Sequence, residues 1–405
     1  MYSDIPTPFI EAAIYSISAC CFGRFFVIPK SRNKRPNLYI ILSSAPGIGR
    51  RGDMLNYINQ VKFSAIERYC EERKNSDVEN EMQTQILEGG SPQGLADDII
   101  YHRKKGLNSY CLSSTEFGRI LDSIKHGQGY MTLFDSLLCK LWSGEPYYES
   151  FSKKGGNESR YVKPGTYFNI CSTSQKIKLY LDDKMSQTGL CRRLLVASVE
   201  GTDIDFTKYK APMGYDTEKM VEDLKDFGSK IGAAMLGYHN RANGKIIELP
   251  CSSESLDKIN KYAEPWAKKV LEDDENPYFL YQQTRWEYVL KVAANIALLQ
   301  GKRTIAIEQV DAAITFVDNC TKDIRTILER SQIPTKMKDQ ENHLNRICDY
   351  FKKGLTQREV QSRMSGYGVH AQKHEDIPGF NEYMKILLED GRITMKDNEG
   401  RFNVL

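Results

Sequence analysis

Residues 37–53, NLYIILSSAPGIGRRGD, constrain the fold of this chain more than any other stretch. An apolar run at 38–42 leads into a turn of small residues at 43–49, and the residues after it can form a helix. A strand, a Gly-rich turn and a helix in this order bring N–H groups of the turn and of the helix N-terminus together, where they can bind phosphate. The stretch therefore predicts an α/β fold with a phosphate-binding turn. An ordinary tight connection between a strand and a helix is the alternative.

The turn matches the phosphate-loop pattern G-x-x-x-x-G-K-[ST] only in part. Gly49 fits the pattern, while Ser44 stands at its first Gly. Arg50 takes the place of the Lys, and Arg51 takes the place of the Ser or Thr. The candidate nucleotide-binding residues are Ser44, Pro46, Gly47, Ile48, Gly49, Arg50 and Arg51.

Composition limits the class of protein without identifying its partner. A chain of 405 residues is expected to form two to three units, and a net charge of +3 is too small to indicate one kind of ligand. Basic residues cluster between residues 24 and 35, and no acidic residue lies among them. This pattern fits a solvated connector or a nucleic-acid contact.

The cysteines and the N-terminus indicate a cytoplasmic chain without a membrane partner. The ten cysteines include no CxxC pair, and the N-terminus lacks the features of a signal peptide, so reduced thiols are expected. Glu11 and Arg24 interrupt the apolar segment 9–28, which favours a core helix over a membrane span. His370 and His374 are four residues apart but have no other Cys or His close by, so no metal site is predicted.

Polar residues follow two further predicted strands. Residues 109–114 form a strand candidate that ends at Thr115 and Glu116. In phosphate-loop enzymes a carboxylate at this place polarises the attacking water, so Glu116 is the candidate base, while Thr115 stands where an Asp would support Mg2+. A Thr N-cap with an acid in the first helical turn is the alternative. Thr173 follows a strand at 166–171, where such ATPases place a group that orients water.

Basic residues later in the chain are candidates for phosphate contacts. Segment 149–161 is rich in Lys, Gly and Ser, and it fits either a hairpin touching DNA phosphates through Lys153, Lys154 and Arg160 or a surface loop. Two arginines, Arg192 and Arg193, stand directly before an apolar strand, and Arg285 begins a helical stripe of core residues.

Residues 334–405 have the plan of a winged helix. A polar linker precedes three predicted helices, and two short strands close the chain. Lys373, Arg392 and Lys396 are the candidate DNA contacts. Because acids nearly balance the basic residues of this unit, contact with a protein is the alternative.

In series, these elements resemble the AAA+ ATPases of the minichromosome-maintenance group. They resemble still more closely the helicase-like phosphate-loop proteins of plasmids, integrated elements and viruses. The resemblance covers about residues 36–400 and depends on the order of the motifs: PGIGRR as Walker A, STEFGRIL as Walker B, and residues 172–174 as sensor 1. It implies ATP as the cofactor, DNA and a replication protein as partners, and a homo-oligomer such as a hexameric ring.

The same resemblance implies roles for single residues and a division into domains. Glu116 and Thr173 would act on the attacking water, Arg192 or Arg193 would be an arginine finger, and Arg285 would be the second sensor. The implied domains are an N-terminal helix with a basic connector at 1–35, a phosphate-loop NTPase core at 36–215, a helical lid at 216–333 and a winged helix at 334–405.

Two departures from this group concern Mg2+. Arg51 removes the hydroxyl that ligates the ion, and Thr115 removes the supporting Asp. An Arg at position 50 can still meet phosphate, although its planar head does not reproduce the point charge of a Lys. We hypothesise that ATP is bound while Mg2+-dependent hydrolysis is weak or absent; Glu116 and Arg285 favour the alternative that hydrolysis is retained.

Two functions remain open from the sequence. One is a helicase-like motor that acts on DNA in the replication of a mobile element. The other is a non-catalytic pseudo-ATPase whose winged helix binds DNA or a partner.

Overall fold

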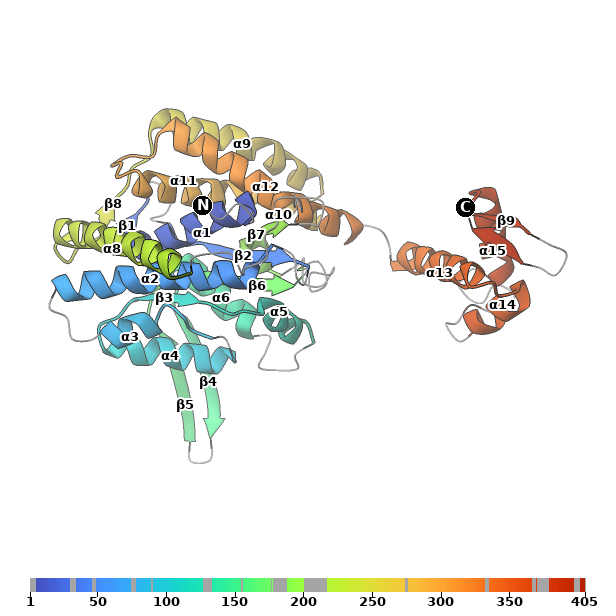
Figure 1. Cartoon of the computed structure of the whole chain (residues 1–405), viewed down its shortest axis with the longest axis horizontal. Helices are drawn as coiled ribbons and strands as arrows, with labels where there is room; N and C mark the ends of the chain where they lie inside the picture. The colour runs from blue at the N-terminus through green and yellow to red at the C-terminus, as the bar shows by residue number, and fades with distance from the viewer. Residues whose placement is uncertain are drawn as a thin grey trace. The chain divides into compact units, whose positions relative to one another are not determined.

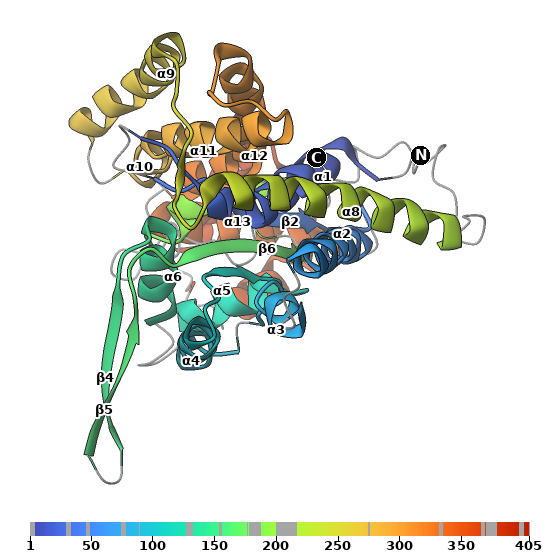
Figure 2. The ribbon, with the colours of Figure 1, turned by 90° about the vertical axis from the view of Figure 1, so that its left-hand side faces the viewer.

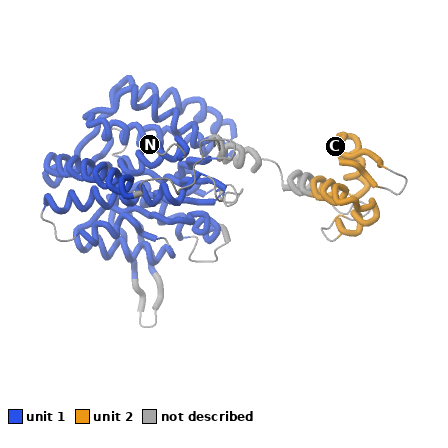
Figure 3. The backbone as a smooth tube through the Cα atoms, viewed as in Figure 1, with its two compact units in different colours: residues 1–329 blue, residues 330–405 orange. Residues whose placement is uncertain are grey.

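The computed structural model forms two compact units, Met1–Glu329 and Arg330–Leu405 (Figure 3). Each unit has its own core of buried apolar side chains. The structure describes residues 5–29, 34–45, 49–73, 78–88, 90–126, 133–153, 156–175, 177, 188–199, 217–273, 276–331, 335–365, 369, 379–396 and 401–404.

A parallel four-stranded sheet lies at the centre of the first unit. Its strands are β2 (Tyr39–Ser44), β3 (Ser109–Leu112), β6 (Tyr167–Gln175) and β7 (Leu195–Val199), in the order β3-β6-β2-β7. The run of apolar residues that predicted β2 is almost fully buried, as expected for a strand covered on both faces. The predicted α/β class is confirmed by this sheet.

The strand ends align at one edge of the sheet. Ser44 pairs with Gln175 on one side and with Val199 on the other, so the carboxyl ends of β2, β6 and β7 coincide. We call this the carboxyl edge. Ligands of open parallel α/β sheets bind beyond the carboxyl ends of the strands, which makes this edge the first place to look for a site.

Helices cover both faces of the sheet. In Figure 2, α11 (Arg285–Leu299) lies above β6, whereas α4 (Pro92–Lys104) and α5 (Phe117–His126) lie below it. The first helix, α1 (Thr7–Cys21), packs into the same core and is bound to α11 by the Ser18 hydroxyl, which donates to the Asn295 carbonyl over 3.0 Å. The prediction that this segment is a core helix is confirmed.

The structure describes the following further elements of the first unit. The helices are α2 (Arg51–Glu72), α3 (Val78–Gln83), α6 (Leu133–Ser143), α8 (Thr217–Ala242), α9 (Ser253–Glu272), α10 (Pro277–Gln283) and α12 (Ile307–Ser331), with 3-10 turns η1 (Gly23–Phe25) and η4 (Cys191–Arg193). Short strands β1 (Phe26–Val27) and β8 (Ile247–Glu248) pair in parallel. Among the described residues, no helix is both long and apolar enough to cross a membrane.

Helices α2 and α8 run side by side in nearly direct backbone contact (Figures 1 and 2). A Cβ atom added to Gly232 of α8 would lie 2.4 Å from the Ala65 carbonyl oxygen of α2. Only a residue without a side chain permits this approach. The helices from α8 onward therefore belong to the same compact unit as the sheet up to residue 329.

An antiparallel hairpin projects from the first unit (Figures 1 and 2). It consists of β4 (Tyr147–Lys153) and β5 (Gly156–Val162), and its base is anchored by the buried side chains of Tyr147 and Val162. Segment 149–161 lies in this hairpin, while its contact with DNA phosphates stays a prediction. Lys154 lies outside the described residues.

The described part of the second unit contains three helices and a terminal hairpin. They are α13 (Thr335–Lys352), α14 (Gln357–Ser365), α15 (Phe380–Glu389), β9 (Ile393–Met395) and β10 (Phe402–Val404), and the two strands pair antiparallel. Thr356 caps α14: its amide donates to Glu359 Oε2 over 2.8 Å, and its hydroxyl lies 2.9 Å from the same oxygen. The Glu359 pKa is lowered by these two hydrogen bonds.

One segment differs from the sequence prediction. Strand β6 continues to Gln175, so residues 172–174 lie inside the strand and not after it. Between α2 and α4 the chain forms α3, where Glu81 is buried and makes an ion pair with Arg24. Strand β6 is longer because its neighbours β2 and β3 supply partners for its polar residues.

Candidate functional site

The carboxyl edge brings together several residues that the sequence singled out. Ser44 ends β2, Glu116 follows β3, and Thr173 lies near the end of β6. Helix α2 starts at Arg51, seven residues after Ser44, so its N-terminus lies at the same edge. Three more candidates, Pro46, Gly47 and Ile48, lie outside the described residues.

Arg50, the described residue directly before α2, gives the helix N-terminus no side-chain cap. Gly49 has a φ of 72° and Arg50 a φ of 49°, so two successive residues are left-handed. The first N–H groups of an α-helix have no partner inside the helix, and the Arg50 side chain makes no capping hydrogen bond to them. Its Nε atom instead donates to Asp53 Oδ2 over 2.8 Å. An uncapped helix N-terminus of this kind suits an anion such as phosphate.

Gly49 is required by its surroundings as well as by its φ angle. A Cβ atom there would lie 2.9 Å from Cε2 of Phe9, on the buried side of α1. The turn is therefore held between the strand end and the first helix of the chain.

Arg51 covers the end of β2. Its Nη1 atom donates to the Ser44 carbonyl over 3.1 Å and to the Ala45 carbonyl over 3.2 Å, and it lies 3.3 Å from the Ser44 hydroxyl. The hydroxyl of Ser43 accepts a hydrogen bond from the Ile177 amide over 3.0 Å. Arg51 has no hydroxyl of its own to ligate Mg2+, and its guanidinium group lies against the Ser44 hydroxyl, so an ion ligated by Ser44 does not fit here.

Glu116 and Thr173 bind the neighbouring strand ends to each other. Glu116 Oε1 accepts a hydrogen bond from the Gln175 amide over 3.3 Å, and the Thr173 hydroxyl donates to the Thr115 carbonyl over 2.5 Å. The Ser114 hydroxyl accepts a hydrogen bond from the Glu116 amide. The alternative from the sequence was a cap by Thr115, and the structure forms a similar bond through the residue before it. Both candidate catalytic side chains therefore hold the edge together in this state.

Arg285 is fully buried and lies at the other end of β7. Its Nη2 atom donates to the Arg192 carbonyl over 2.5 Å and its Nη1 atom to the Leu194 carbonyl over 3.3 Å. The end of β7 at Val199 is five positions after Leu194, which is about 16 Å along a strand. Within the first unit, the structure does not bring Arg285 to the carboxyl edge.

The two finger candidates lie beside Arg285, before β7. The Arg192 carbonyl accepts from Arg285 and from the Thr284 hydroxyl over 3.3 Å. Arg193 Nη1 donates to the Gly189 carbonyl over 2.8 Å and lies 3.4 Å from Cys139 Sγ. These contacts bind η4 to α10, α11 and α6, away from the turn that precedes α2.

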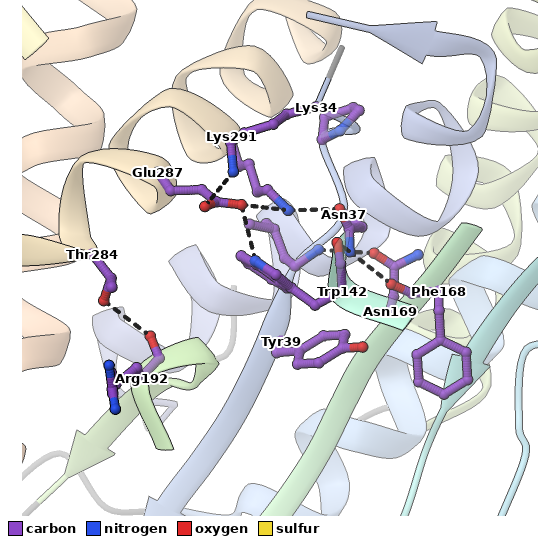
Figure 4. Close-up of polar contacts among 12 residues, drawn as sticks. Lys34, Asn37, Tyr39, Trp142, Phe168, Asn169, Arg192, Thr284, Glu287 and Lys291 are labelled. Atoms are coloured by element: carbon purple, nitrogen blue, oxygen red, sulfur yellow. Dashed lines mark hydrogen bonds and ion pairs between the residues drawn. The ribbon is translucent and has the colours of Figure 1, made fainter. Parts of the chain in front are cut away.

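A buried network of charged groups joins α11 to the start of β2 (Figure 4). Glu287 Oε2 lies 2.5 Å from Lys34 Nζ, and Glu287 Oε1 accepts from Trp142 Nε1 over 2.9 Å. Lys291 donates to Asn37 Oδ1 over 2.7 Å and lies 3.4 Å from Glu287 Oε1. Burial lowers the pKa of Lys291 to about 7. Sequence reasoning took the α11 stripe as core only, although the i,i+4 spacing of the acid and the lysine was a signal.

The hairpin has one anchored face and one exposed face. Arg160 forms a bidentate ion pair with Asp97 of α4, at 2.7 and 3.1 Å, so this predicted DNA contact serves to fix the hairpin. On the other face, Tyr148 and Tyr161 are opposite each other and are 63% and 49% exposed. Sequence reasoning missed this pair, which only the strand register reveals. The Lys153 side chain lies outside the described residues.

In the second unit, two of the three predicted contacts are described. Arg392 Nε lies 3.6 Å from Asp390 Oδ2, and the Lys396 side chain is exposed on the terminal hairpin. Lys373 lies outside the described residues.

The fold and the edge together define a parallel α/β protein with a helix N-terminus and polar strand ends at one site. No protein-family model matches the sequence, and no curated protein is significantly similar to it. The function must therefore be argued from the residues and their geometry.

Proposed function

We propose that the carboxyl edge binds the phosphates of a nucleotide, with ATP as the ligand. The observation that carries this proposal is the uncapped start of α2 directly after β2, with Ser44, Glu116 and Gln175 at the same edge. Backbone N–H groups at a helix N-terminus and a carboxylate nearby suit a triphosphate and a water molecule. The N–H groups bind the anion whether or not a metal ion accompanies it.

Hydrolysis assisted by Mg2+ is weak or absent in this proposal. Arg51 supplies positive charge where the ion would bind, and its contacts with Ser44 and Ala45 fix that charge in place. An arginine stabilises phosphate charge without a metal, but it does not activate water. Glu116 remains the group that would accept a proton from water.

This proposal is tested by measuring phosphate release from ATP by the full chain, with and without DNA. We expect no release above the background of a Glu116→Gln variant, which keeps the hydrogen-bond acceptor facing Gln175. Turnover that Glu116→Gln abolishes would show that the edge hydrolyses ATP and would contradict the account of Arg51.

We propose further that the chain acts on DNA as a helicase-like AAA+ protein in the replication of a mobile element. Single-stranded nucleic acid binds by stacking its bases on aromatic side chains next to basic residues. The exposed Tyr148 and Tyr161 pair, close in sequence to Lys153 and Lys154, has this character. The homo-oligomeric ring and the replication partner belong to the same proposal and follow from the resemblance.

The hairpin is tested with a Tyr148→Ala/Tyr161→Ala variant. Loss of one stacked base weakens binding by about 1–3 kcal/mol, so affinity for a single-stranded oligonucleotide should fall at least fivefold. Tyr101→Ala is the matched control, because Tyr101 is 55% exposed on α4 and outside the hairpin. Equal affinity of the double variant and the control would exclude stacking on the hairpin.

A non-catalytic scaffold is the second candidate, since the second unit has its own hydrophobic core and the three-helix and hairpin order of a winged helix. It predicts that residues 330–405 alone bind double-stranded DNA as tightly as the whole chain. If the affinity of this fragment for DNA is more than tenfold lower than that of the whole chain, DNA binding belongs to the first unit. Light scattering of the whole chain with ATP and DNA then separates a ring from a monomeric scaffold.

A further inference from the structure

A polar cleft lies in the first unit at the amino end of β3, which is the end opposite to the carboxyl edge. Its volume is about 630 Å³, within the range of small-molecule sites. Its lining comes from η1, α2, α3, the segment between α4 and β3, and α8. The residues that matter for its chemistry are Arg24, Tyr69, Arg73, Lys105, Ser109 and His239.

Positive charge predominates in this cleft. Among the described residues that line it, Arg24, Arg73 and Lys105 are cations and Glu81 is the only carboxylate. Glu81 forms a buried ion pair with Arg24. Arg73 donates to the Tyr69 hydroxyl over 2.9 Å. The lining thus carries about two net positive charges, the complement of a dianion.

Arg24 and Arg73 are held in position by the ring of Tyr69. Their guanidinium carbons lie 4.9 and 5.1 Å from the centre of that ring, and the Tyr69 hydroxyl lies 3.1 Å from His239 Nδ1. Burial and then the charges of Arg73 and Arg24 lower the pKa of His239. Both guanidinium groups therefore lie against a side chain that lines the cleft.

Ser109 supplies an observation that is independent of charge. Its side chain is 5% exposed, it lines the cleft, and its hydroxyl has no hydrogen-bond partner among the described residues. A buried hydroxyl without a partner is unfavourable, and it is normally satisfied by a ligand or a water molecule. The Ser109 hydroxyl can donate to an anion that the arginines attract.

We infer that this cleft binds a small phosphorylated molecule, with Arg73 and Lys105 at its phosphate oxygens and Ser109 donating from the buried side. Guanidinium groups bind phosphate through two parallel N–H donors, which suits the fixed position of Arg73. The site is separate from the proposed nucleotide edge, because Ser109 begins β3 and Glu116 follows its end. The chain would thus sense or carry a second phosphorylated ligand.

The probe is inorganic pyrophosphate, titrated into the full chain by calorimetry at constant ionic strength. Arg73→Gln and Ser109→Ala should each weaken binding at least tenfold. Lys104→Gln is the matched control, because this exposed lysine precedes Lys105 but does not line the cleft, and it should leave binding unchanged. Ser109→Ala removes only a hydroxyl without a partner, so it is expected to fold.

An Arg50→Gln variant separates the two phosphate sites. Pyrophosphate binding that survives Arg50→Gln and is lost in Arg73→Gln supports the inference. Binding that is lost in Arg50→Gln and unchanged in Arg73→Gln and Ser109→Ala would place the ligand at the carboxyl edge and overturn it. The inference would also be overturned if pyrophosphate showed no saturable binding. It would be overturned as well if Arg73 bound an oligonucleotide and not pyrophosphate.

Discussion

Replacing Arg51 by Thr should make nucleotide binding depend on Mg2+. Mg2+ binds oxygen at about 2.1 Å, so an ion on the Ser44 hydroxyl would lie at most about 5.4 Å from Arg51 Nη1, which is 3.3 Å from that oxygen. At an effective dielectric constant of 20, the repulsion between one charge and a divalent ion at that separation is about 6 kcal/mol. Even a third of this value corresponds to a change in affinity of more than tenfold.

The assay is a fluorescent-nucleotide titration of the full chain in Mg2+ and in EDTA. Wild type should bind equally in both, and Arg51→Thr should bind at least tenfold more tightly in Mg2+. Arg51→Lys is the matched control, because it keeps the charge and should remain insensitive to the ion. Mg2+-dependent binding by wild type that equals that of Arg51→Thr would refute the role given to Arg51.

Three further predictions concern stability. Gly232→Ala should lower the free energy of unfolding by about 1–3 kcal/mol, because its Cβ would clash with the α2 backbone. Gly237→Ala on the same helix would contact nothing, so it should not lower the free energy of unfolding, and urea denaturation compares the two variants. Arg285→Lys should destabilise the nucleotide-free chain by about 2 kcal/mol or more through lost bonds to two carbonyls, and an unchanged melting temperature would contradict its structural role. The pKa of Lys291 is about 7 in the folded chain against an ordinary value of 10.5, so the unfolded chain binds more protons between these values and stability rises with pH. The free energy of unfolding of the wild type should rise by about 2 kcal/mol from pH 7 to 9 relative to that of Lys291→Met, as measured by parallel denaturation curves. If the free energy of unfolding changed equally with pH in both proteins, the lowered pKa of Lys291 would be excluded.

Local patterns predicted most of the elements of this fold. The apolar run before Ser43 could only be a buried strand, because it is too short for a helix and ends in a turn of small residues. Ser91 and Thr356 stand directly before two helices, and each accepts a hydrogen bond from the first helical turn, as the capping ability of Ser and Thr predicts. These features depend on residues close in sequence, so the sequence alone is enough to find them.

The partners of the long basic side chains could not be predicted in this way. Arg160 was a candidate for DNA and Arg285 for nucleotide, yet each meets groups brought by tertiary packing: Asp97 on α4 and the carbonyls before β7. An arginine has five donors, and a sequence does not show which acceptors lie within reach. The exposed Tyr148 and Tyr161 pair likewise depends on the strand register.

The same limit applies to the carboxyl edge. The order of strand, turn and helix predicted where the edge lies. Arg51 at the place of a Ser or Thr predicted that Mg2+ would lack a hydroxyl ligand. That the guanidinium turns back onto the end of β2 follows only from the three-dimensional contacts with Ser44 and Ala45. The edge was thus predictable in position but not in its hydrogen bonding.

The most direct test of the central claim is calorimetric titration of ATP into the full chain in EDTA. The account predicts saturable binding at one site per chain, weakened at least tenfold by Gly49→Ala, which strains the left-handed turn before α2. Phosphate release in the same samples, after Mg2+ is added, should stay at background. Absence of ATP binding in EDTA and in Mg2+ would show that the edge is only a structural turn and would contradict the account.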